Sequence, residues 1–375
     1  MEVGLEKTLV FLIFIALGVT LKTKFKAPEE INGIKKIILN LALPATICIA
    51  LLGIRIDLTL LLLPLFALAF NVVLFGISPF VLRIIGVRKN TPAFRTARLL
   101  MPSLAPGLSC FPFVLEFLGD GALAQVAMAD LGNKVFVLIV LYLIAMRWYY
   151  QKNQIQNTAG KAKLASLVKT LVTEPVNLFI ALALILLGFG LTMDTIPFIF
   201  ADSLSKLSLM MTPLVLVFIG LAVKFKKHQF AQIASVLLLR AGLVFLLVGM
   251  VNPLFGPQLQ EEVLLMLAFG LSACSFWPYA HIAIVDKLEK GKREKTFDSG
   301  YAVALLALSF PFSTSLILGV LNSGSLFVPT ANLILTAMVF MGMGMVYPFV
   351  GYLRKKSTLI RLADPKIETA QAERL

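Results

Sequence analysis

The chain has 375 residues, of which 59% are hydrophobic and 14% are charged, whereas an ordinary soluble domain has about 25% charged residues. A soluble protein of this size needs a polar exterior. The composition therefore excludes a water-soluble enzyme, a secreted disulfide scaffold and a disordered chain. The formal charge of +14 is typical of a membrane protein that keeps Lys and Arg in its cytoplasmic loops. We therefore expect a multi-pass protein of the cell membrane whose surroundings are the lipid bilayer, with no nucleic-acid partner.

Eleven stretches are apolar enough to cross a bilayer, because a spanning helix needs about 20 mostly apolar residues. They predict an all-α membrane protein of about eleven transmembrane helices. The predicted spans are 5–21, 35–54, 58–85, 99–118, 122–147, 174–192, 197–223, 229–251, 262–286, 298–321 and 328–352.

Basic and acidic loops alternate along these spans without a break. The loops poor in cations hold acids such as Asp57, Glu116, Asp194 and Glu261. Because cytoplasmic loops retain Lys and Arg, we expect the N-terminus outside the cell and the C-terminus in the cytoplasm. The basic segments are 22–36, 83–98, 147–169, 224–227, 287–295 and 354–361.

The two halves of the chain carry the same landmarks. Pro44 lies 68 residues before Pro112, and Pro213 lies 65 residues before Pro278. Each unit has five spans, an odd number, so the second unit enters the membrane from the opposite side, as in many secondary transporters. The predicted organisation is a first five-helix repeat, a cytoplasmic basic linker, a second inverted five-helix repeat, an additional transmembrane helix and a cytoplasmic tail, at residues 1–150, 151–173, 174–321, 322–352 and 353–375.

The fourth and ninth spans carry helix breakers at corresponding positions. Proline removes a backbone donor and clashes with the preceding turn, and interrupted helices in membranes line buried sites. We expect the two breaks, near 105–112 and 272–278, to cross and to form the substrate site; simple kinks are the structural alternative. Ser and Cys beside the breaks either contact substrate or only pack between helices. The candidates for substrate contact here are Ala105, Gly107, Ser109, Cys110, Pro112, Ser272, Ser275 and Pro278.

Three stretches, 17–47, 110–130 and 174–224, resemble the auxin efflux carrier family of permeases. They include an Asn-x-x-x-Pro second helix, here Asn40 and Pro44, and the broken helix ending at Pro112. The resemblance covers roughly residues 5–321. It implies a panel-and-core fold with two crossing broken helices, shared with bile acid symporters, and organic anions as substrates.

The chain also departs from that family. The Asn-Thr-Gly opening of the fourth helix falls at Ala105, Pro106 and Gly107, so its Asn and Thr are missing. The family's Asn-Pro start of the sixth helix is Glu174 and Pro175 here, and the eleventh span is additional. These departures leave the identity of the substrate open.

One cation lies deep in a predicted span. Arg240 is about twelve residues into the eighth span, roughly 17 Å from its start. A charge there costs several kcal/mol unless it is paired or hydrated. Arg240 and Asn71 each lie 27 residues after their anchor proline, which makes them symmetry equivalents. Arg240 either meets a substrate carboxylate or an acidic gate partner, or serves a permanent internal ion pair or a snorkelling contact.

Three further titratable residues are candidates for ion coupling. Asp130 and Lys134 are four residues apart, the spacing of a helical ion pair, and such a pair is equally a structural feature. His281 follows Pro278 by three residues and either carries a coupling proton or is a satisfied core histidine. The coupling ion, proton or sodium, stays open.

Nothing in the sequence supports catalysis. The chain has no P-loop, HExxH helix or GxSxG elbow, and it carries no metal-ligand or cofactor motif. We expect a secondary active transporter of a small organic anion that works by alternating access, driven by an ion gradient or the membrane potential. The alternatives are a sodium-coupled bile-acid-type symporter, a non-transporting ligand sensor and an intramembrane enzyme. The extra helix, with Met341 to Met345, suggests packing in a homodimer.

Overall fold

The computed structural model describes residues 2–25, 27–54, 58–153, 160–222, 230–255 and 260–362. All regular elements within these ranges are helices, and none is a strand. Because every backbone bond of a helix is made inside the segment, this is the architecture that a lipid environment requires.

Seven of the helices in the described residues are long and apolar enough to cross a membrane. The chain is therefore a multi-pass helical membrane protein. Four of the eleven predicted spans are not among these seven: one is α1 (Glu2–Leu21), one is the short apolar helix α10 (Pro175–Gly188), and two are interrupted. The seven are Glu29–Leu52, Leu60–Ile84, Phe111–Asn153, Phe198–Leu221, Phe230–Val251, Ser299–Phe327 and Thr330–Val350.

One group of helices, which we call the panel, combines segments from both halves of the chain. Helix α1 packs on α12 (Met211–Ala222), and α10 packs on α3 (Leu43–Leu52). Gly18 and Gly220 allow α1 and α12 to touch, because a Cβ at either position would overlap backbone of the other helix. The panel consists of α1, α2 (Pro28–Ile37), the π-helical turn Ile38–Ala42, α3, α10, α11 (Phe198–Leu209) and α12.

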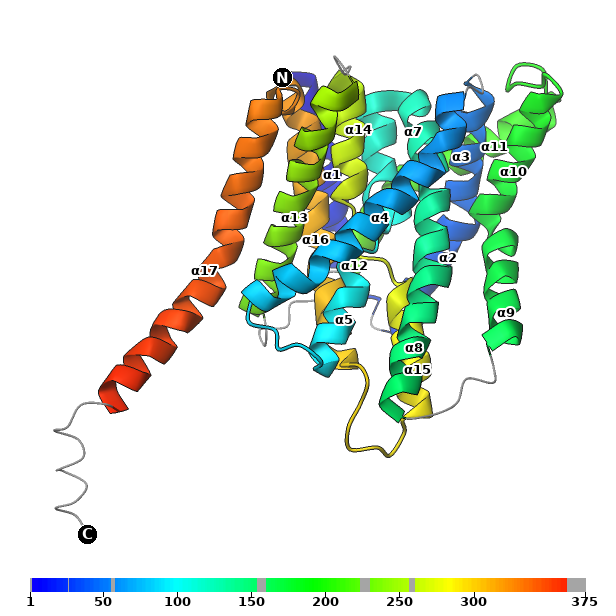
Figure 1. Ribbon diagram of the computed structural model, residues 1–375. Helices are drawn as coiled ribbons and strands as arrows, with labels where there is room; N and C mark the ends of the chain where they lie inside the picture. Colours follow the sequence, from blue (N-terminus) through cyan, green and yellow to red (C-terminus); the bar gives the residue numbers. More distant parts are fainter. Residues whose placement is uncertain are drawn as a thin grey trace, which may run out of the picture.

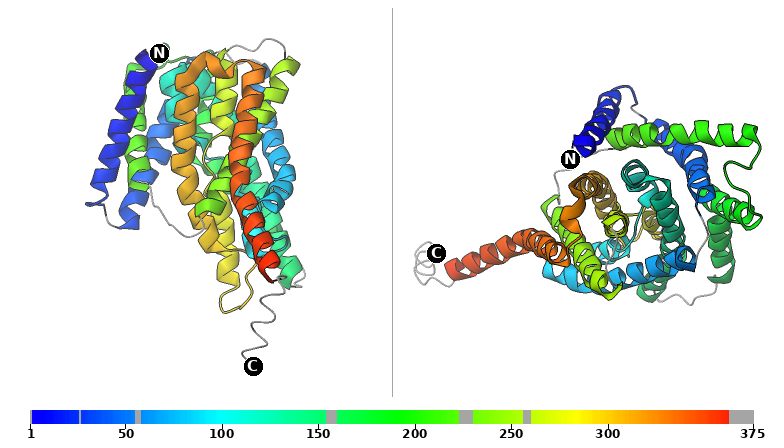
Figure 2. Two further views of the ribbon diagram at one scale, coloured as in Figure 1. Left: turned by 90° about the vertical axis from the view of Figure 1, so that its left-hand side faces the viewer. Right: turned by 90° about the horizontal axis from the view of Figure 1, so that it is seen from above.

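The second group, which we call the core, lies beside the panel when the molecule is seen from above (Figure 2). Its long helix α4 (Leu58–Ile84) packs on α7 (Phe111–Val135), and a Cβ at Gly132 would overlap the carbonyl of Pro64. The core consists of α4, α5 (Pro92–Leu100), α6 (Pro106–Ser109), α7, the π-helical turn Phe136–Val140, α8 (Leu141–Asn153), α13 (Phe230–Val251), α14 (Gln260–Gly270), α15 (Trp277–Leu288) and α16 (Ser299–Ser323).

The C-terminal ends of α4, α8 and α15 lie at one end of the bundle, the lower end in Figure 1. The predicted cytoplasmic linker is partly helical there, because α9 spans Gly160–Thr173. We call the end of the bundle at which α4, α8 and α15 end the basic end. The loops after α10 and α16 lie at the opposite end (Figure 1). Among the described loops, the basic ones after α4 and α15 therefore lie at the opposite end from those after α10 and α16, as the predicted alternation requires.

Helix α17 (Thr330–Leu362) packs along α13 and then projects away from the bundle (Figure 1). Gly344 makes the contact close, since a Cβ there would overlap Leu239. The Met341–Met345 run is divided: Met341 packs toward Gly242, whereas Met343 and Met345 are exposed. The predicted tail 353–375 lies outside the described residues from position 363 onward.

Candidate functional site

The fourth span is interrupted in the structure. Helix α5 ends at Leu100, residues 101–105 are not helical, and the short helix α6 is followed by a break at Cys110. The interruption thus begins four residues before the predicted position. Ala105 precedes Pro106 and has φ −126° and ψ 62°, because a residue before proline is disfavoured in the α conformation.

The ninth span is interrupted at the corresponding place. Helix α14 ends at Gly270 and α15 begins at Trp277, so the break covers 271–276. Pro278 was expected inside the break, but it is in the first turn of α15. Proline is tolerated there because the first turn has no intrahelical acceptor for its missing N–H. Pro112 occupies the same position in α7.

The two breaks are hydrogen-bonded directly to each other, and we call the place where they meet the crossing. The N–H of Ala105 donates to the carbonyl of Ala273 over 2.8 Å. In return, the N–H of Ala273 donates to Ser109 Oγ over 3.0 Å, and the N–H of Ser275 donates to Ser103 Oγ over 3.0 Å. Backbone groups that left their own helices therefore find partners in the other break, as burial requires.

Arg240 of α13 binds the carbonyls of both breaks. Its Nη2 donates to the carbonyl of Ser272 over 2.7 Å and to that of Ser103 over 3.4 Å. The side chain is only 3% exposed, and its Nε has no hydrogen-bond partner. Among the described residues no carboxylate forms an ion pair with Arg240. The permanent internal ion pair expected as the structural alternative is therefore absent from the described residues, and the nearby acid Asp130 pairs with Lys134 instead.

Asn133 of α7 holds the first break in the same way. Its Nδ2 donates to the carbonyl of Leu104 over 3.0 Å, and its Oδ1 accepts the N–H of Leu104 over 3.3 Å. Asn71 of α4 donates to the same Oδ1 over 3.0 Å. The proposed symmetry mates Asn71 and Arg240 therefore both serve the crossing, Asn71 through Asn133 and Arg240 directly.

Lys134 joins the core to the panel. Its Nζ lies 3.5 Å from Asp130 Oδ2 on its own helix, which confirms the predicted pair. It also lies 3.3 Å from Glu174 Oε1 and donates to Asn177 Oδ1 over 2.9 Å, both at the start of α10. The side chains of Lys134, Asp130 and Glu174 are each at least three-quarters buried. An ion pair with so little solvent is costly to break by removing one partner.

His281 is buried in the core, away from the breaks' hydrogen bonds. Its Nε2 lies 2.9 Å from the carbonyl oxygen of Val137, and its ring stacks edge-on against Tyr142. This is the environment of a satisfied core histidine.

The remaining residues that were predicted to contact substrate differ in their exposure to solvent. Ser109, Cys110, Ser272 and Ser275 are buried at the crossing itself, where they bond backbone or pack. Ala105 and Gly107 are partly exposed toward the panel, and a Cβ on Gly107 would lie 3.0 Å from Leu43 of α3.

A lysine of the panel lies over an aromatic ring of the second break. Phe276, in the second break, is 52% exposed, and the Nζ of Lys35 on α2 lies 4.4 Å from the centre of its ring. A cation over a ring face is an attractive contact. Of residues 101–110 and 271–276, only Ala105, Gly107 and Phe276 are not buried, and we call these three residues the crossing wall.

Sequence reasoning missed Ser103, Asn133 and Ser309, whose side chains bond the breaks. Only Asn133 carried a signal, because it lies three residues after Asp130 on the same helix face. It also missed Glu174 and Asn177 as partners of Lys134.

No protein-family model matches the chain, and no curated protein matches it at the significance required. Evidence for the function therefore comes from the crossing itself.

Proposed function

We propose that the protein is a secondary active transporter that moves a small organic anion across the cell membrane by alternating access. The observation that carries the proposal is the unneutralised Arg240 at the crossing of two interrupted helices. The resemblance to auxin efflux carriers supports the same substrate class.

The charge at the crossing favours an anion. A guanidinium stays protonated at any physiological pH, and burial without an ionic partner leaves its charge uncompensated by the described residues. Ser272 and Ser103 supply only carbonyl dipoles. The N-terminal end of α15 faces the same region and adds partial positive charge. A carboxylate that approaches the crossing wall thus enters a positive potential, and Lys35 lies beside its path.

We also propose that the fold consists of two inverted five-helix repeats plus the extra helix α17, eleven spans in all. The matched breaks support this plan. The exchange of partners supports it too, because α1 of the first half packs on α12 while α10 of the second half packs on α3.

Alternating access would then move the core against the panel. The crossing wall faces the panel, and the close approach of Gly107 to Leu43 marks one point of contact. Lys134 ties the two groups through Glu174. Protonation of either carboxylate partner would weaken that tie, which makes Asp130, Lys134 and Glu174 candidates for coupling to protons, with sodium as the competing ion.

Uptake into liposomes containing the purified protein tests the proposal. Radiolabelled aliphatic and aromatic monocarboxylates and dicarboxylates are the probes, under an imposed proton gradient, an imposed sodium gradient, or none. We expect one class of carboxylate to accumulate under a gradient. Arg240→Gln should abolish this accumulation, whereas the charge-matched Arg147→Gln, at an exposed position in the middle of α8, should not.

Two other outcomes of this experiment would favour the alternative functions. Accumulation only with sodium would favour the bile-acid-type symporter. Saturable carboxylate binding without any flux would favour the ligand sensor and overturn the transport proposal.

A further inference from the structure

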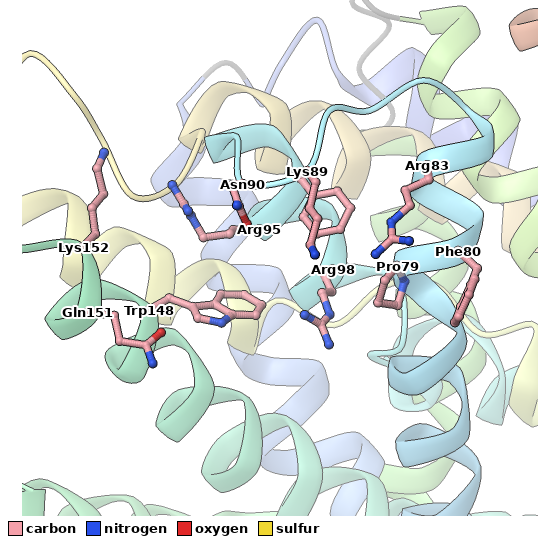
Figure 3. A pocket seen from close by; sticks show the side chains of 11 residues that line it. Pro79, Phe80, Arg83, Lys89, Asn90, Arg95, Arg98, Trp148, Gln151 and Lys152 are labelled. Carbon is pink, nitrogen blue, oxygen red and sulfur yellow. The ribbon is translucent and has the colours of Figure 1, made fainter.

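A cavity of about 640 Å³ opens at the basic end, away from the crossing. Its walls come from the last turns of α4, the loop before α5, α5 itself and the end of α8 (Figure 3). Five cations line it, and none of the lining residues is acidic: Arg83, Lys89, Arg95, Arg98 and Lys152. We call it the basic pocket.

Two of the five cations are already engaged. Arg95 Nε donates to the carbonyl of Thr296 over 2.8 Å, and Lys152 donates to the carbonyl of Lys295 over 2.8 Å. Lys152 also lies 3.8 Å from Glu294, whose side chain is 89% exposed.

The other three cations have no acidic partner among the described residues. Arg83, Lys89 and Arg98 line the same pocket, and Figure 3 shows them between Phe80 and Trp148. Arg98 stacks 4.5 Å from the ring centre of Phe75 and 5.5 Å from that of Trp148, and its Nε is buried without a hydrogen-bond partner. Gathering three uncompensated cations costs free energy through mutual repulsion unless an anion enters.

The arrangement of donors fits a phosphate group. Two guanidinium forks and an ammonium can surround one phosphate, and arginine binds phosphate oxygens in a bidentate manner. The pocket wall continues onto an apolar surface, because Phe80 of α4 is 62% exposed and Arg83 lies 5.8 Å from its ring centre. Helix α4 lies on the perimeter of the bundle (Figure 2), so this surface faces the acyl chains of the bilayer.

We propose that the basic pocket binds the phosphate headgroup of an anionic phospholipid, with its acyl chains along α4 beside Phe80. Basic pockets between helices at the cytoplasmic side of membrane proteins bind such headgroups. A free phosphate would satisfy the cations equally, but it would leave Phe80 without a role. The lipid would brace α5, the helix that leads into the first break, and the inference does not depend on the transport function.

The test compares matched charge-removal variants in nanodiscs. Arg83→Gln/Lys89→Gln removes two exposed cations of the pocket, so the fold should persist. Lys290→Gln/Arg293→Gln removes two exposed cations of the loop after α15, at the same end but outside the pocket. The probes are a phosphatidylcholine bilayer, the same bilayer with about one-fifth phosphatidylglycerol, and the neutral bilayer with inorganic phosphate.

Native mass spectrometry then counts the lipids that stay bound after release from each nanodisc. We expect the wild type and the loop variant to retain phosphatidylglycerol, and the pocket variant to retain at least fivefold less. Arg98→Gln should reduce retention similarly. Equal retention by the pocket and loop variants would overturn the proposal. Binding of inorganic phosphate to the wild type but not to the pocket variant in the neutral bilayer, without selective retention of phosphatidylglycerol, would assign the pocket to a soluble phosphate and would also overturn the proposal.

Discussion

The Nη2 of Arg240 lies 2.7 Å from the carbonyl oxygen of Ser272, so a side chain from α13 fastens the break between α14 and α15. The same nitrogen reaches the carbonyl of Ser103 in the other break. One buried cation therefore bonds to both interruptions.

Removal of Arg240 should weaken both the fold and the site. Arg240→Lys keeps the charge but loses the planar fork, so anion affinity should fall tenfold to a hundredfold, or about 1–3 kcal/mol. Titration of the transported carboxylate against the purified variant measures this. The double variant Asp130→Asn/Arg240→Gln should be no more stable than Arg240→Gln alone, because Asp130 pairs with Lys134. A rescue in the double variant would contradict the structure.

The serine hydrogen bonds between the breaks should stabilise the fold more than the hydrogen bonds of serines on helix surfaces. Ser109→Ala leaves the buried N–H of Ala273 without its acceptor, which costs about 1–3 kcal/mol. We expect a lower thermal unfolding midpoint in detergent. The control is Ser315→Ala on α16, whose exposed hydroxyl bonds only the carbonyl of Pro311 in its own helix. Equal midpoints for the two variants would argue against a bonded crossing.

The loop after α15 should make stability depend on pH. Burial alone raises the pKa of Glu289, but hydrogen bonds from the backbone and hydroxyl of Thr296 and from Asn153 outweigh it, so the pKa is lowered from 4.5. A carboxylate with a lowered pKa stabilises the fold above its unfolded-state pKa, and this stability is lost as the pH falls below about 4.5.

Glu289→Gln should therefore lower the unfolding midpoint at pH 7 and reduce the further fall on acidification. The control is Glu294→Gln, since the Glu294 side chain is 89% exposed. Tryptophan fluorescence during heating at several pH values measures the midpoint. A wild-type midpoint that rises between pH 5 and pH 4 would contradict the sign of this effect.

Orientation can be measured with single cysteines. Residues 152–170 and 355–375 should be cytoplasmic, and 322–325 external. Gly160→Cys should resist an impermeant maleimide on whole cells, whereas the exposed Ser325→Cys should react. The three native cysteines are buried and give little background. Labelling of position 160 from outside would reverse the assignment.

The helices and the two breaks could be predicted because lipid imposes a simple rule on sequence. Long Leu- and Phe-rich runs must be helical there, and prolines such as Pro106 mark where a helix cannot continue. The crossing followed from the matched positions of Pro112 and Pro278 in the two halves.

The bonds that fasten the crossing could not be predicted. The partner of Arg240 is a pair of backbone carbonyls, and no sequence pattern marks a carbonyl as an acceptor. Nothing in the sequence marks Ser103 or Asn133 as a partner of a break, because their hydrogen bonds depend on how segments distant in sequence pack together. Likewise, Lys134 reaches Glu174 forty residues away only because α10 packs beside α7's end.

The central claim is that Arg240 serves translocation of an anion, and current measurement on a solid-supported membrane tests it most directly. Proteoliposomes are exposed to a jump in the concentration of each carboxylate probe at constant ionic strength. For one class of carboxylate we expect a transient current, because binding and movement of the anion displace charge within the membrane. This current should be absent in Arg240→Gln and intact in Arg147→Gln. An unchanged current in a well-folded Arg240→Gln protein would contradict the account.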